Sequence, residues 1–251
     1  MRRSVWLAGA AIIAAAPADA RFAPAVGAYR LERIEERDDG QRVRRFAMTR
    51  IVTFTRRGAG YVATMRIVPD SVAGDDGYRS VQRAMAAMPV DIELDRAGRL
   101  TGVRDRDGAW ARLRAALAAI GPANAAALRL HDAMPAAQRD AILAEPLTAV
   151  IAADLTSRRT GEREVTLPYA RHDGSAGRAS GVETVRAGRD AAVVTTEVRS
   201  ADGAATFALR RRLTLEPRTG LAREVVEERR ARDGAASLVK TITLRLTPVV
   251  S

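Results

Sequence analysis

Two strand-like zones separated by an alanine-rich helical zone most constrain how this chain folds. Residues 21–106 and 156–251 contain runs in which apolar and polar residues alternate, as in half-buried strands. Residues 107–155 show helical spacing instead. We therefore expect a single α+β domain over residues 21–251. Its core is predicted to be a large antiparallel sheet with the helical segment packed on it.

The first strand-like zone begins with a predicted hairpin. Tyr29–Arg37 and Val43–Thr55 are extended segments on either side of a turn at Asp38-Asp39-Gly40. Alternation continues over residues 61–67. Residues 78–88 are compatible with a short helix or with an irregular crossing.

Three carboxylates lie on the face opposite to Val90, Ile92 and Leu94 in the next predicted strand. Asp91, Glu93 and Asp95 alternate there with apolar residues. Such a row could bind a cation, or it could pair with arginines of neighbouring strands. The abundance of arginine favours ion pairing.

The helical zone opens with Asp107 as the expected N-cap. The first helix should end at Gly121-Pro122. Its apolar stripe has two interpretations, packing against the sheet, which we favour, or a lid over a ligand cavity. The stripe residues, which are the candidate ligand-cavity residues, are Trp110, Leu113, Leu117 and Ile120.

Further helices should follow in the same zone. Asn124 is a candidate cap of a second helix, and Pro135 suits the first position of a third. Pro146 is expected to break or restart this run, which leaves residues 147–155 on a last short helix.

The second strand-like zone contains three clear alternating or β-branched segments. These are Val193–Val198, Phe207–Leu215 and Leu238–Thr247. A turn at Glu216–Gly220 should join the second of them to the strand that follows.

Residues 1–20 have the three parts of a secretory signal peptide. Arg2-Arg3 is a cationic start, residues 5–16 are apolar, and Ala18-Asp19-Ala20 is a small-x-small cleavage site. We expect cleavage after Ala20 and a periplasmic location, with full secretion as the alternative. Both the general secretory route and the twin-arginine route stay open. The apolar run is too short to span a membrane.

The chain is basic, with a formal net charge of +11. This charge favours anionic partners such as lipid head groups or another anionic envelope component. Lys240 is the only lysine, and the arginines are interleaved with acidic residues. Aromatic residues make up 4% of the chain, and no stacking or recognition motif is present, so nucleic acid is not an expected partner. The absence of cysteine excludes disulfides and thiolate chemistry.

Catalytic patterns are weak. The two histidines, His131 and His172, are each followed by an aspartate, and Ser175 lies close to the second. Consecutive residues seldom place a nucleophile, base and orienting acid in line, so we interpret 172–175 as a loop. No metal or cofactor motif is found, and no cofactor is expected. A pair of carboxylates acting as a hydrolase site stays open.

The turn Leu215–Leu221 resembles a hairpin that is frequent in secreted β-rich proteins, and the order of zones behind a signal peptide resembles the periplasmic lipid and lipoprotein carriers that form half-barrels. The resemblance implies a large, strongly curved antiparallel sheet, half-barrel-like, with the helical segment packed on it or filling its mouth. It also implies a concave apolar face that holds a lipid or lipoprotein. Our first hypothesis is therefore non-enzymatic binding of a hydrophobic or amphiphilic ligand. The alternatives are a module that contacts protein or cell wall through an arginine-rich face, and a hydrolase without a recognisable motif.

Overall fold

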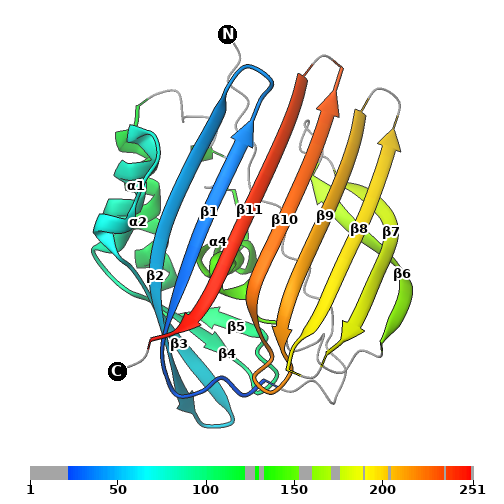
Figure 1. Ribbon diagram of the computed structural model, residues 1–251. Coiled ribbons are helices and arrows are strands. Elements are labelled where there is room, and N and C mark those ends of the chain that lie inside the picture. The colour runs from blue at the N-terminus through cyan, green and yellow to red at the C-terminus, as the bar shows by residue number, and fades with distance from the viewer. Residues whose placement is uncertain are drawn as a thin grey trace.

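The computed structural model describes residues 22–121, 128–129, 133–152, 160–170, 176–188, 190–202, 205–234 and 236–249. Within these residues, eleven strands form one antiparallel sheet, accompanied by three α-helices (Figure 1). The strands are β1 (Gly27–Asp38), β2 (Val43–Arg57), β3 (Gly60–Ile67), β4 (Val90–Leu94), β5 (Leu100–Val103), β6 (Gly161–Ala170), β7 (Ala176–Ala187), β8 (Ala192–Asp202), β9 (Ala205–Glu216), β10 (Leu221–Asp233) and β11 (Ala236–Pro248). The helices are α1 (Asp76–Ala86), α2 (Arg106–Ala119) and α4 (Ala136–Thr148), with a short 3₁₀ turn η1 (Pro69–Ser71).

The sheet consists of two meanders joined at its centre. Its strand order is β5-β4-β3-β2-β1-β11-β10-β9-β8-β7-β6. Every neighbouring pair except β1 and β11 is also consecutive among the strands of the chain. The β1–β11 pairing, with Leu31 opposite Leu246, joins the two strand-rich zones. The prediction of an α+β fold with a large antiparallel sheet and a helical insert is confirmed.

The sheet is less curved than the resemblance to half-barrel carriers implies. It is open, and it is neither closed nor strongly curled (Figure 1). Strong curling needs bulges or glycine kinks repeated along the strands. The registers between named strands shift at two places only, between Glu93 and Leu94 and between Ala222 and Glu224.

The helices lie on one side of the sheet, which we call the inner face. Figure 1 shows α4 behind β1, β11 and β10, with α1 and α2 beside β2. Leu147 of α4 is completely buried in a core that includes Leu31 of β1 and Leu213 of β9. Burying one such side chain contributes about 2 kcal/mol. This packing fixes the helical segment over the sheet.

Helix boundaries differ in detail from the expectations. Residues 76–86 form a helix, with the Asp75 carboxylate accepting the Tyr78 backbone N–H at 2.8 Å. In α2 the N-cap is Asp105, at φ 44°, so Asp107 lies in the first turn and is not the cap. A carboxylate is favourable at either place because the first-turn N–H groups are unpaired. The α2 helix ends before Gly121, as expected, and α4 begins one residue after Pro135.

Pro146 does not break the chain's last described helix. It lies inside α4, two residues before the helix ends, and its ring is buried in the core. Pro146 has no N–H to donate to the Ile142 carbonyl one turn earlier, and the burial of its ring offsets that lost backbone bond. The expected short helix after Pro146 is therefore wrong. Residues 150–152 instead lie beside the start of β10, where Ile151 forms a bridge with Leu221.

Several predictions fall outside the described residues. They concern the signal peptide of residues 1–20, the Asn124 cap and Leu155. Among the helices that are described, none combines the length and the apolar character needed to cross a bilayer.

Candidate ligand-binding face

Charged side chains cross the inner face in a line from β6 to β1, which we call the charged row. Their alignment follows from the pairing registers, in which Lys240 lies opposite Arg37 and Arg229, and Glu227 lies opposite Arg211. The row contains six cations and three carboxylates: Arg163, Arg211, Arg229, Lys240, Arg37 and Arg33, with Glu183, Glu227 and Glu35. The apolar core lies on one side of this row.

Glu35 of β1 contacts three cations of the charged row. It is 4% exposed and contacts Arg33 at 2.6 Å, Arg37 at 2.5 Å and Lys240 at 3.2 Å. Burial alone would raise the pKa of Glu35, but Lys240, Arg33 and Arg37 together lower it to about 2. Burial also lowers the pKa of Lys240, and Glu35 opposes part of that effect. Glu35 therefore neutralises only part of the positive charge around it.

Elsewhere in the charged row, each carboxylate contacts fewer cations than Glu35 does. Glu227 contacts Arg229 at 2.5 Å and Arg211 at 3.9 Å, and the Arg211 Nη2 donates to the Ala149 carbonyl. Near the sheet edge, Glu183 contacts Arg163 at 2.8 Å. Each carboxylate of the charged row thus has an arginine partner, and the row contains more cations than carboxylates.

An apolar strip lies beyond the charged row, on the side away from the core. Its members are inner-face residues that stay partly exposed: Val165, Leu167, Tyr169, Phe207, Leu209 and Leu238. The Tyr169 ring stacks on Phe207 with centroids 4.2 Å apart, and its hydroxyl donates to Ser200 at 3.2 Å. Gly177 permits this, because a Cβ there would lie 2.5 Å from the Tyr169 ring.

Each side chain of the strip stays partly exposed within the part of the protein that the structure describes. Figure 1 shows the described helices beside β2 and behind β1, β11 and β10, and none of them behind β6 or β7. The inner face thus presents an apolar area, the strip, directly beside a charged area, the charged row. Such a surface suits a molecule that has an apolar part and a charged part.

The four candidate cavity residues on α2 have different environments. Trp110 is 4% exposed in the core, with the Arg139 guanidinium 5.6 Å from its ring centre. Leu113 packs against the core, Leu117 is partly buried, and Ile120 is exposed near Gly77 of α1. The α2 helix contacts α1 and α4. The structure thus places the first two in or against the core, and a cavity role for the four stays a prediction.

The three carboxylates of the β4 region are engaged in local contacts. Arg104 pairs with Glu93 at 2.9 Å and with Asp91 at 3.9 Å, and the Asp95 carboxylate accepts the backbone N–H of Ala97. Within the described residues, no cluster of three or more metal-ligating side chains is found. Asp91 and Glu93 are thus ion-paired, as the sequence favours, whereas Asp95 accepts backbone N–H groups of its own turn.

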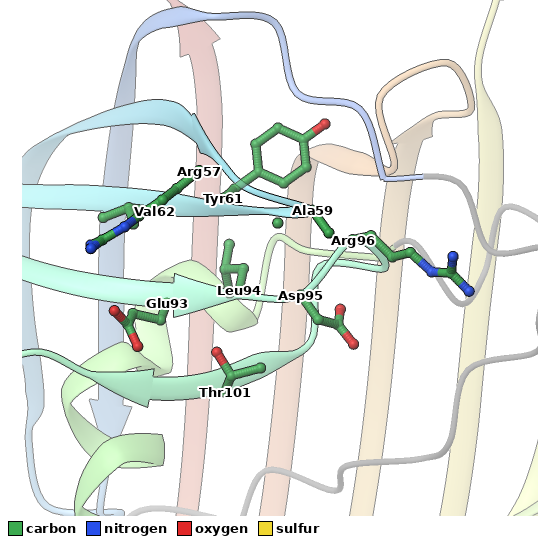
Figure 2. Close-up of a pocket in the computed structure, with 10 residues that line it drawn as sticks. Arg57, Ala59, Tyr61, Val62, Glu93, Leu94, Asp95, Arg96 and Thr101 are labelled. Carbon is green, nitrogen blue, oxygen red and sulfur yellow. The ribbon is translucent and has the colours of Figure 1, made fainter.

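An open hollow of about 530 Å³ lies at the same end of the sheet (Figure 2). It is lined by the ends of β3 and β4, with Tyr61, Glu93 and Asp95 among its side chains. Its carboxylates are the engaged ones just described. Both carboxylates of the hollow thus have local partners, Arg104 for Glu93 and the backbone of the Asp95 turn for Asp95.

The candidate catalytic residues His131, His172, Asp173 and Ser175 lie outside the described residues, so the loop interpretation stays a prediction.

The outer face of the sheet has mixed charges. Arg230 pairs with Glu228 at 2.6 Å, and Arg245 pairs with Glu224 at 3.2 Å. Its arginines are interleaved with acids, as the sequence indicated.

Sequence reasoning missed the charged row. The signal was present in β1, where Leu31, Arg33, Glu35 and Arg37 continue one alternation that starts on the core face. An inward-facing series that changes from apolar to charged residues marks such a row.

Comparison of the whole chain with protein families and with characterised proteins finds no match to either.

Proposed function

We propose that this chain is a non-enzymatic binding protein for an amphiphile, held on the inner face of the sheet. The observation that carries the proposal is the apolar strip, which stays partly exposed directly beside the cation-rich charged row. Apolar side chains exposed together commonly mark a binding surface. The pattern of residues 1–20 supports a location in the cell envelope, where amphiphiles are abundant.

The two parts of the surface suit the two parts of such a ligand. The strip would take the apolar chain, with a favourable transfer free energy of about 0.8 kcal/mol for each CH₂ group removed from water. Leu209 lies directly opposite Arg229 across the β9–β10 pairing, so the strip and the row are in contact. A chain on the strip thus brings its head group to the arginines.

Replacement of Leu209 with Glu should weaken binding of an uncharged apolar probe at least tenfold, because the new carboxylate makes the strip polar. N-phenyl-1-naphthylamine, which fluoresces in apolar surroundings, is a suitable probe, and titration gives its dissociation constant. Thr206→Glu is the matched control, since Thr206 is an exposed residue on the outer face of the same strand.

The wild-type protein and the Thr206→Glu variant should bind the probe equally well. Absence of probe binding to the wild-type protein would rule out the proposed function. Equal binding by Leu209→Glu would move the site away from the strip. Circular dichroism checks that both variants are folded.

A further inference from the structure

Arg50 of β2 is a buried cation on the inner face without a visible partner. Its side chain lies in register with Leu31 of β1 and Ile67 of β3, and the residue is 8% exposed. Its Nε and Nη1 atoms are shielded from solvent and have no hydrogen-bond partner in the described structure. Burial, and then the nearby Arg33 charge, lower the pKa of Arg50 to about 10, which still leaves it charged at neutral pH.

A buried unpaired guanidinium is unfavourable for the folded protein. Removing a charge from water costs several kcal/mol unless an opposite charge and hydrogen bonds compensate. The described residues supply no acceptor for the Nε and Nη1 donors of Arg50, which leaves this charge without the compensation that burial requires.

The surroundings of Arg50 contain a second arginine and one replaceable acid. Arg33 donates to Glu35 and to Glu145 of α4, at 2.6 Å in each case. Glu35 is buried and holds three cations, whereas the Glu145 side chain is 38% exposed. Glu145 and Tyr78 of α1 are close enough to influence Arg50 electrostatically.

We propose that Arg33 and Arg50 form a binding site for an anionic group, a carboxylate or a phosphate, carried by an amphiphile. The inference rests on the proposed function and names the head group. Arg50 is level with Leu31 of the core, so this site lies across the charged row from the strip, and the ligand's chain has to cross the row to reach Leu209. Glu145 occupies the place of this group in the unliganded protein. On binding, the Glu145 carboxylate moves into solvent and the ligand's oxygens accept hydrogen bonds from both guanidinium groups, a geometry that arginine favours.

The test compares three probes with the same chain: dodecanoate, dodecyl phosphate and dodecanol, each used below its aggregation concentration. Their dissociation constants follow from displacement of N-phenyl-1-naphthylamine. The wild-type protein should bind at least one of the two anions about tenfold or more tightly than the alcohol. Preference for dodecanoate indicates a fatty-acid carboxylate, and preference for dodecyl phosphate indicates a phosphorylated lipid.

Replacement of Arg50 with Met should abolish this preference while the affinity for dodecanol stays unchanged. Arg45→Met is the matched control, because Arg45 lies on the outer face of the same strand with a 65% exposed side chain. Glu145→Gln should increase the affinity for the preferred anion about threefold or more, since the competing charge is removed. Glu36→Gln, on the outer face, should leave it unchanged.

A preference that survives in a folded Arg50→Met variant overturns the site. Binding of the naphthylamine with no preference among the three probes also overturns it, while the proposed function stands. Failure of the wild-type protein to bind any of the four probes overturns both. If Arg50→Met does not fold, Glu145→Gln decides, and unchanged anion affinity in that variant contradicts the proposal.

Discussion

Replacing Glu35 with Gln is expected to lower the free energy of unfolding by about 3 kcal/mol. The carboxylate is buried and compensates Arg33, Arg37 and Lys240, so its loss leaves three cations close together without their shared anion. The size of the effect follows from the lowering of its pKa from 4.5 to about 2, since one pKa unit corresponds to about 1.4 kcal/mol. Urea denaturation at pH 7 measures the change.

Glu36→Gln is the control for this prediction. Glu36 is the next residue on β1, its side chain is 50% exposed, and it pairs with Arg45 at 3.7 Å. Surface ion pairs contribute about 0–1 kcal/mol. A loss in Glu35→Gln as small as in this control would show that the cations around Glu35 do not depend on its charge.

The contribution of Glu35 should also depend on pH in a defined direction. Because its pKa is lower in the folded protein than in the unfolded chain, its stabilisation is fully present above about pH 5. It is lost as the pH falls from 4.5 to about 2. The difference in unfolding free energy between wild type and Glu35→Gln should therefore shrink over that window. A difference that stays constant from pH 6 to pH 2.5 would contradict the assignment.

The sequence predicts the strands well because their alternation is local. The segments around Tyr29–Arg37, Val43–Thr55 and Leu238–Thr247 all lie within strands of the structure. Turn chemistry is equally local, as in the β9–β10 turn, where Gly220 adopts φ 74° and its N–H donates to the Glu216 carbonyl at 3.0 Å. Such features need no knowledge of distant residues.

Other features depend on tertiary contacts that no local pattern contains. Pro146 remains helical because its ring is buried in the core, against its own backbone preference. Sheet curvature depends on bulges, which the alternation does not show. The Arg33–Glu145 contact joins residues 112 positions apart and needs the placement of α4 over β1. The charged row was missed for this reason, although each of its charged residues can be seen in the sequence.

Replacing Arg50 with Met is expected to have the opposite effect to Glu35→Gln, raising the free energy of unfolding by about 2 kcal/mol. The pKa of Arg50 falls from 12.5 to about 10 in the folded protein, so folding penalises its charge at every pH below about 10. That penalty is relieved as the pH rises from 10 towards 12.5, and Met removes it altogether. The pKa difference corresponds to about 3 kcal/mol, from which imperfect packing of Met subtracts a part.

The melting temperature of Arg50→Met should rise by about 4–8 °C, and that of the outer-face control Arg45→Met should hardly change. A lower melting temperature in Arg50→Met would mean that the chain itself satisfies this guanidinium, which would also remove the reason to expect an external anion. The two charge removals have opposite signs because the inner face holds more cations than carboxylates. Taking away an anion increases the surplus, and taking away Arg50 reduces it. A buried surplus of positive charge lowers the stability of the unliganded protein and favours the binding of an anion. A bound anionic amphiphile should therefore stabilise the wild-type protein more than it stabilises Arg50→Met.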